Sequence, residues 1–319
     1  MIHLAKTLMK KNPSRIIKKT VIITGYTCNN NCQFCIDADK RAIATKTTRQ
    51  IIEEMTDARK RGTTYLEFIG GEMTIRPDFI NLLKEAKKLN FKTIMMATNG
   101  RMLAYPNYAK KVAMAGLTDI VFSIHGFNAG QHDSLTQSAG SFEQLMAGFE
   151  NMKKNLGIEA IGSNTTIVKQ NYRHLRQIGE LIYDLGIRNS EFIFVDCNEG
   201  AAKNEFNKFV PKISVAAPFI RQCLAIGKKN KVSHWHIRYV PLCYFTDYLD
   251  QISELLEVKK FKTEHLAPDF INWDVEKSRP EIGRAKAPQC RKCSLNSRCE
   301  GIWKNYLAHY GNKELKPIK

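Results

Sequence analysis

The 319-residue chain is short of acidic residues. It has 31 Asp and Glu against 49 Lys and Arg, which gives a formal net charge of +18 at pH 7. This excess predicts an acidic partner, such as nucleic acid, an acidic peptide, or a substrate that carries phosphate or carboxylate groups. Lysine-rich solvated helix faces, or a basic proteome, explain the charge equally well, because the lysines are dispersed in pairs rather than gathered in one block.

Long apolar runs, repeats and low-complexity segments are also missing. The apolar residues over 1–11 are broken by lysines, with no apolar core of signal-peptide length and no small-residue cleavage site. No later run approaches the length of a membrane span. We therefore expect a soluble, cytoplasmic protein with no membrane partner, in which a hydrophobic content of 43% supplies a sizeable core.

Seven of the nine cysteines fall in or near groups typical of metal sites. The first group is Cys28, Cys32 and Cys35, directly after the apolar run Val21-Ile22-Ile23. A C-x3-C-x2-C loop can point three thiolates at one centre, and thiolates are the usual ligands of iron-sulfur clusters. Three ligands leave one iron of a four-iron cluster open to bind a reactant. The alternatives are a zinc loop, although zinc prefers paired C-x2-C knuckles with a fourth ligand, and a disulfide with a spare cysteine.

Apolar runs alternate with helical periodicity along most of the chain. We expect strands at 21–25, 65–69, 93–97, 119–124, 158–168 and 191–195. Helices between them are expected to be capped by Thr47 with Gln50, by Ser141 with Gln144, and by Asn171. Six strand–helix units predict an α/β fold with a parallel sheet curved into a partial (β/α)6 barrel. We also expect a basic lead-in over 1–18, a linker over 198–212, a helix over 213–226 and a strand over 235–240.

Candidate site residues lie where these strands end, because sites in such folds form at the carboxyl ends of the strands. Gly70-Gly71-Glu72 follows the second strand. Its glycines let backbone approach a ligand closely and its carboxylate offers negative charge to an ammonium group, although a plain turn is the alternative. The other strand-end candidates, which could instead tie up loop backbone, are Asn99, Ser123 and Asn164. His125 could face the substrate, whereas a helix-capping role is expected for Asp133.

With Phe34 before its last cysteine, the cysteine loop resembles that of the radical SAM superfamily. The resemblance implies a partial TIM-like barrel over 19–212, and a [4Fe-4S] cluster whose free iron is chelated by S-adenosylmethionine. Reductive cleavage would give a 5'-deoxyadenosyl radical that abstracts hydrogen from substrate, with flavodoxin or ferredoxin as the electron donor. The cofactor-binding residues that the resemblance implies are Phe34, Gly70, Gly71, Glu72, Asn99, Ser123 and Asn164. One departure is Met73, where the family usually has proline.

A second cysteine group lies in the C-terminal third. Cys243, Cys290, Cys293 and Cys299 resemble the SPASM and twitch extensions of radical SAM enzymes, which implies a small domain over 213–319 with one auxiliary [4Fe-4S] cluster. A further SPASM cysteine is replaced by Trp303. A structural zinc site with four cysteine ligands is the alternative. Cys197 could donate a hydrogen atom to a substrate radical, and Cys223 is expected in the core; simple burial would suit both.

The resemblance implies a peptide or protein substrate for maturation, attracted by the basic surface. A small-molecule dehydrogenase, mutase or epimerase acting on a sugar, nucleotide or cofactor precursor is the second hypothesis. RNA modification ranks third, because no basic stretch is interleaved with aromatic residues. A hypothesis of another class is a non-catalytic, metal-stapled module that binds nucleic acid.

Overall fold

The computed structural model describes residues 16–232 and 234–319, so most of the predicted lead-in over 1–18 lies outside the described residues. The strands are β1 (Ile17–Ile23), β2 (Tyr65–Ile69), β3 (Thr93–Thr98), β4 (Asp119–Ser123), β5 (Ile161–Ile167), β6 (Asn189–Phe194), β7 (His234–Arg238), β8 (Phe261–Leu266), β9 (Ile271–Asn272), β10 (Arg284–Ala285) and β11 (Ile302–Trp303). The α-helices are α2 (Thr48–Lys60), α3 (Phe79–Lys88), α4 (Pro106–Met114), α5 (Ala129–Thr136), α6 (Ser141–Leu156), α7 (Leu175–Asp184), α8 (Gly200–Asn204), α9 (Phe206–Phe209), α10 (Ile213–Lys229), α11 (Ser253–Lys260), α12 (Val275–Ile282) and α13 (Lys304–Tyr310).

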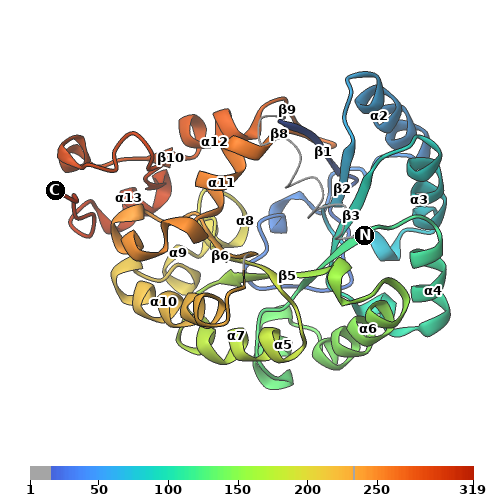
Figure 1. Cartoon of the computed structure of the whole chain (residues 1–319), viewed down its shortest axis with the longest axis horizontal. Coiled ribbons are helices and arrows are strands. Elements are labelled where there is room, and N and C mark those ends of the chain that lie inside the picture. Colours follow the sequence, from blue (N-terminus) through green and yellow to red (C-terminus); the bar gives the residue numbers. More distant parts are fainter. Residues whose placement is uncertain (1–15, 233) are drawn as a thin grey trace.

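One sheet organises the molecule. Its strand order is β7-β6-β5-β4-β3-β2-β1-β8-β9, and all neighbours are parallel except β9, which is antiparallel to β8. Helices α2, α3, α4, α6, α7 and α10 follow one another around the outside of the strands (Figure 1). The predicted parallel α/β fold is confirmed. The sheet continues through β7 and β8, so the predicted domain boundary at 212 falls between two adjacent strands of one sheet.

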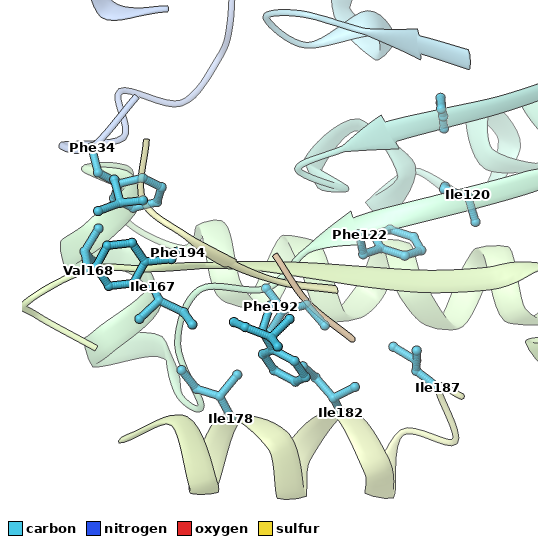
Figure 2. Close-up of a cluster of buried hydrophobic side chains, with 14 of the residues drawn as sticks. Phe34, Ile120, Phe122, Ile167, Val168, Ile178, Ile182, Ile187, Phe192 and Phe194 are labelled. Carbon is cyan, nitrogen blue, oxygen red and sulfur yellow. The ribbon is translucent and has the colours of Figure 1, made fainter. Parts of the chain in front are cut away.

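Alternating burial along the strands separates an outer, helix-covered face from an inner one. In β2, β3 and β4 every second residue is buried, and the intervening ones are half-buried. Figure 2 shows the outer layer, in which side chains of β4, β6 and α7 pack together, among them Phe122, Phe192 and Ile182. Since the half-buried residues point to the other face, the sheet presents polar groups such as Asn164 and Glu191 to its interior.

The local signals differ in how well they predicted helix starts. Thr47 and Gln50 form the expected capping box on α2. The N-cap of α6 is Gly140 rather than Ser141, because the Ser141 hydroxyl donates to Asp133 at 2.8 Å. Asn171 makes no capping bond, since its amide donates to the carbonyls of His125 and Thr166. The predicted linker over 198–212 is also wrong, because it contains α8 and α9.

The expectation that no run reaches membrane-spanning length needs one correction. Phe206–Lys229, which includes α10, is long and apolar enough to cross a membrane by length and composition alone, and half of its most apolar stretch is buried inside the protein. Gly227 leaves no room for a side chain beside Trp235 of β7, and Gly179 of α7 leaves none beside Cys223. This close packing is that of a helix that lies against the protein core.

Candidate active site at the strand ends

The cysteine loop follows β1 and is held by backbone hydrogen bonds to two distant helices. The amides of Asn31 and Gln33 donate to the carbonyls of Thr136 and Leu135, at the end of α5, at 2.9 and 3.0 Å. The amide of Ala201 in α8 donates to the carbonyl of Cys35 at 3.0 Å. The loop is therefore fixed by elements that follow β4 and β6.

The three thiols of this loop are partly buried. Burial raises the pKa of Cys28 and Cys35, and burial together with the neighbouring thiolates raises the pKa of Cys32 to about 12. The amide of Asn30 donates to Cys28 Sγ at 3.3 Å, a bond that favours the thiolate. Ionising all three thiols at neutral pH therefore requires a positively charged partner, which an iron-sulfur cluster supplies. Within the described ranges, no three Cys, His, Asp or Glu side chains already stand close enough to enclose a single metal ion.

The turn after β2 is packed against the cysteine loop. Gly71 has φ +53°, and a Cβ there would lie 2.1 Å from the carbonyl oxygen of Thr27. Only glycine fits this contact, and the next amide, that of Glu72, donates to the same carbonyl at 2.9 Å. Gly70 is similarly confined, because its φ is +87° and a Cβ there would lie 2.8 Å from the carbonyl oxygen of Gly25. The paired glycines thus join the β2 turn to the residue before the first cysteine.

Glu72 lies beneath the strand ends with 2% of its surface exposed. Its carboxylate accepts hydrogen bonds from the Thr98 hydroxyl at 2.7 Å, from the Asn99 amide at 2.7 Å, and from the amide and hydroxyl of Thr74. Both oxygens are therefore used to join β2 to β3. Its expected role toward an ammonium group stays a prediction.

Asn99, Ser123 and Asn164 lie at three neighbouring strands and are half-buried. The Asn99 side-chain amide donates to Asn29 Oδ1 at 2.7 Å and lies 3.7 Å from Cys28 Sγ, so this residue contacts the cysteine loop directly. Ser123 and Asn164 are register partners on β4 and β5. The structure brings Asn99 to the thiols and places the other two side by side farther along the sheet.

Arg101 is a site residue that the sequence reasoning missed. Its guanidinium donates to the carbonyl of Asn29, to Asn30 Oδ1 at 2.9 Å and to Gln144 Oε1 at 2.6 Å. It therefore braces the cysteine loop against α6. Its place two residues after Asn99 is the only signal that the sequence offered.

Phe34 packs over a buried histidine pair. Its ring meets His125 edge-on with centroids 4.9 Å apart, and His125 stacks on His132 at 6.0 Å. Burial lowers the pKa of His125 to about 3 and that of His132 to about 4, so both rings are neutral at pH 7. The suggestion that His125 faces substrate is not supported, because it is 6% exposed and its Nδ1 accepts from the Thr166 amide. Asp133 caps α6 as expected, accepting from the amides of Gly140 and Phe142.

Cys197 and Cys223 are both buried, at 0% and 1% exposure. Cys197 follows β6, and burial raises its pKa to about 12. Cys223 lies in α10 beside Trp235, whose indole N–H donates to the Cys223 carbonyl. Their burial favours the packing interpretation over a hydrogen-donor role.

A cavity of about 600 Å³ opens beside the β2 turn, between the ends of β1 and β2 and the start of α2. Its walls include Thr27, Gly70, Glu72, Thr47 and Arg76. This volume is in the range of small-molecule sites. A cofactor bound there would contact the glycine turn and the residue before Cys28.

The second cysteine group forms a separate site. Cys243, Cys290, Cys293 and Cys299 all line one small cavity with Leu242, Leu295 and Leu315. The amide of Gly301 donates to Cys299 Sγ at 3.3 Å, and that of Ile318 donates to Cys293 Sγ at 3.3 Å. Four thiols, two of which accept a hydrogen bond from a backbone amide, fit a group that binds thiolates.

The model of the radical SAM superfamily matches residues 22–182, from β1 into α7. The chain belongs to the radical SAM superfamily. This region contains Cys28, Cys32 and Cys35, the β2 turn and all three strand-end candidates. Members of this superfamily use a [4Fe-4S] cluster and S-adenosylmethionine, and the three-thiol loop fits the expected cluster.

One similar protein is the AdoMet-dependent heme synthase of Methanosarcina barkeri, with 29% identity over 184 residues. The match covers 56% of this chain and 51% of that protein, so the chain spans about half the length of this curated relative. The structure of Streptococcus suis SuiB bound to precursor peptide SuiA superposes with a TM-score of 0.65 at 16% identity, covering 99% of this chain and 78% of SuiB. The structure of anSMEcpe with bound AdoMet and Cp18Cys peptide superposes with a TM-score of 0.65 at 14% identity. The match covers 95% of this chain and 93% of anSMEcpe. Both structures share the fold of this chain.

Proposed function

We propose that this chain cleaves S-adenosylmethionine at a [4Fe-4S] cluster held by Cys28, Cys32 and Cys35, and that it modifies a peptide. The observation that carries the proposal is the joining of the thiol loop to the β2 turn and to Asn99 by close contacts and hydrogen bonds. When bound, the reduced cluster supplies the electron that splits S-adenosylmethionine into methionine and a 5'-deoxyadenosyl radical, which takes hydrogen from substrate.

The protein residues have defined parts in this proposal. Gly70 and Gly71 would bind the methionyl group through their backbone, and the cavity that Gly70 lines would accommodate it. Asn99, Ser123 and Asn164 would bind the ribose or carboxylate of the cofactor. Arg101 holds the thiol loop in place, so that little reorganisation is needed when the cofactor binds.

We further propose that the four cysteines of the C-terminal site hold an auxiliary [4Fe-4S] cluster, within a SPASM or twitch-like region over 213–319. The amide donors at two of its sulfurs support a thiolate-bound group. A zinc site is the alternative, and metal analysis distinguishes the two. Electrons for the first cluster would come from a flavodoxin or ferredoxin in the cytoplasm.

The peptide substrate is supported by two observations. SuiB, whose bound partner is a precursor peptide, shares its fold with nearly the whole of this chain. The net charge of +18 would attract an acidic leader. A small-molecule substrate is the second candidate, favoured by the similarity to a heme synthase. A non-catalytic nucleic-acid module is set aside, because the chain belongs to a superfamily of enzymes.

The test is co-expression of the chain with the short open reading frames that neighbour its gene, followed by mass spectrometry of each peptide. We expect one peptide to change mass only with the intact chain, and not with a variant in which Cys28, Cys32 and Cys35 are alanine. Unchanged peptides, together with turnover of a small molecule from cell extract, would replace the peptide proposal with the second candidate.

A further inference from the structure

We propose that Arg284 is a positioning residue of the four-cysteine site, and that its buried positive charge raises the reduction potential of the group bound there. The inference rests on the proposed auxiliary cluster. It concerns a residue outside both cysteine motifs. Arg284 lies in β10, which pairs antiparallel with β11 so that Arg284 stands opposite Trp303.

A single residue, Gly301, connects Arg284 to a cysteine sulfur. Arg284 Nη2 donates to the carbonyl of Gly301 at 2.6 Å, and the amide of Gly301 donates to Cys299 Sγ at 3.3 Å. The guanidinium therefore orients the residue whose N–H points at the sulfur. Hydrogen bonds to ligand sulfurs are among the levers by which proteins set cluster potentials.

Any side chain at position 301 would clash with the neighbouring strand, so this position requires glycine. Its φ is +85°, and a Cβ there would lie 2.0 Å from the carbonyl oxygen of Ala285. The pairing of β10 with β11 thus holds the Gly301 backbone against the strand that carries Arg284. The link from guanidinium to sulfur is fixed by this short hairpin.

The carboxylates of Glu254 and Glu300 attract the charge of Arg284 from beyond ion-pair distance. Its surface is 2% exposed, and Nε and Nη1 have no hydrogen-bond partner. Within residues 16–232 and 234–319, no carboxylate forms an ion pair with it. Instead the guanidinium lies over the rings of Trp303, at 4.7 Å, and Tyr239, at 5.8 Å. Arg279, by contrast, is paired with Glu257 and Glu300.

A buried cation is costly, and its attraction to Glu254, to Glu300 and to the Cys299 thiolate offsets part of that cost. The thiolates bring negative charge to the cavity, and each electron added to a bound cluster increases it. A nearby cation stabilises the more negative, reduced state more than the oxidised one. Removal of the cation should therefore favour the oxidised state and lower the reduction potential.

The test is a redox titration of the full-length chain, followed by electron paramagnetic resonance. Alanines at Cys28, Cys32 and Cys35 remove the first cluster, so that only the C-terminal signal remains. Arg284→Met should raise the oxidised-to-reduced ratio at a fixed potential at least tenfold, which is 59 mV for one electron. Arg284→Lys keeps the charge but loses the planar donor to Gly301, and should shift the ratio about threefold.

Lys286→Met is the matched control. Lys286 also lines the cysteine cavity, but its side chain is exposed and bonds to Asn296, so solvent screens its charge and the ratio should change less than twofold. A ratio within twofold of the parent for Arg284→Met would overturn the inference. If Arg284→Met binds no iron, Arg284→Lys is used instead, and an oxidised-to-reduced ratio within twofold of the parent would overturn the inference.

Metal analysis of the unsubstituted chain separates the two proposals. Zinc at the four cysteines would overturn the auxiliary cluster and this inference with it. If every variant keeps its iron and the reduction potential does not change, the role of Arg284 is overturned, whereas the proposed auxiliary cluster is not.

Discussion

Gly71 shows how one residue ties two motifs together. Its positive φ and its contact with the Thr27 carbonyl leave no room for a side chain. Gly140 also has a positive φ, of +74°, but a Cβ there would meet nothing within 4 Å. The two glycines therefore share the backbone cost of an L-residue and differ in the steric contact.

We expect Gly140→Ala to lower the free energy of unfolding by about 1–2 kcal/mol, the usual cost of left-handed backbone. Gly71→Ala should cost more and should also reduce the iron bound at the cysteine loop, because the turn must move away from Thr27. Chemical denaturation and iron analysis measure the two effects. Equal stability and equal iron in the two variants would contradict the close contact.

The buried pair of His125 and His132 gives a second prediction at this scale. Burial lowers both pKa values, to about 3 and about 4, whereas an unfolded histidine titrates near 6.5. The neutral rings stabilise the fold above pH 6.5, and this contribution is lost as the pH falls from 6.5 toward 4.

His125→Gln should therefore be less stable than the parent at pH 8, with a difference that narrows between pH 6.5 and 4 by up to about 1.4 kcal/mol per pH unit. Denaturation curves at several pH values give the comparison. A constant difference across this range would show that His125 does not titrate in this way.

Among the elements, α5 has a role that its sequence does not reveal. Its last two residues accept the amides of Asn31 and Gln33 from the cysteine loop, and Asp133 joins α5 to the start of α6. The end of this helix is thus a support for the thiols.

Asp133→Ala should lower the free energy of unfolding by about 1–2 kcal/mol, as for loss of a helix cap, and should speed the loss of iron in air. Asn128→Ala removes the cap at the other end of α5, where Asn128 accepts from the Gln131 amide. It should cost similar stability but leave the rate of iron loss unchanged. Equal rates in both variants would argue against the support role.

The sequence predicted those elements whose signals are local. The strand over 65–69 matches β2, because apolar and polar residues alternate within it, and the Thr47 capping box is local as well. The pairing of β8 with β1 could not be foreseen, since it joins residues more than 240 positions apart. For the same reason Arg101 and Arg284 were missed: each acts on a backbone group that only the fold brings near.

At the scale of the whole molecule, the chain holds two groups of cysteines in different settings. The first lies at the carboxyl ends of the sheet, and the second brings Cys243, which follows β7, together with Cys290, Cys293 and Cys299, which follow β10. Under the proposed function, only the first group carries out cleavage. Removing the first set of thiols should leave the second metal group in place.

The most direct measurement is iron and sulfide analysis of the anaerobically purified chain, followed by reduction with dithionite in the presence of S-adenosylmethionine. We expect about eight irons per chain and formation of 5'-deoxyadenosine. With alanine at Cys28, Cys32 and Cys35, about four irons should remain and no 5'-deoxyadenosine should form. Bound zinc without iron, and no cleavage by the intact chain, would contradict the proposed function.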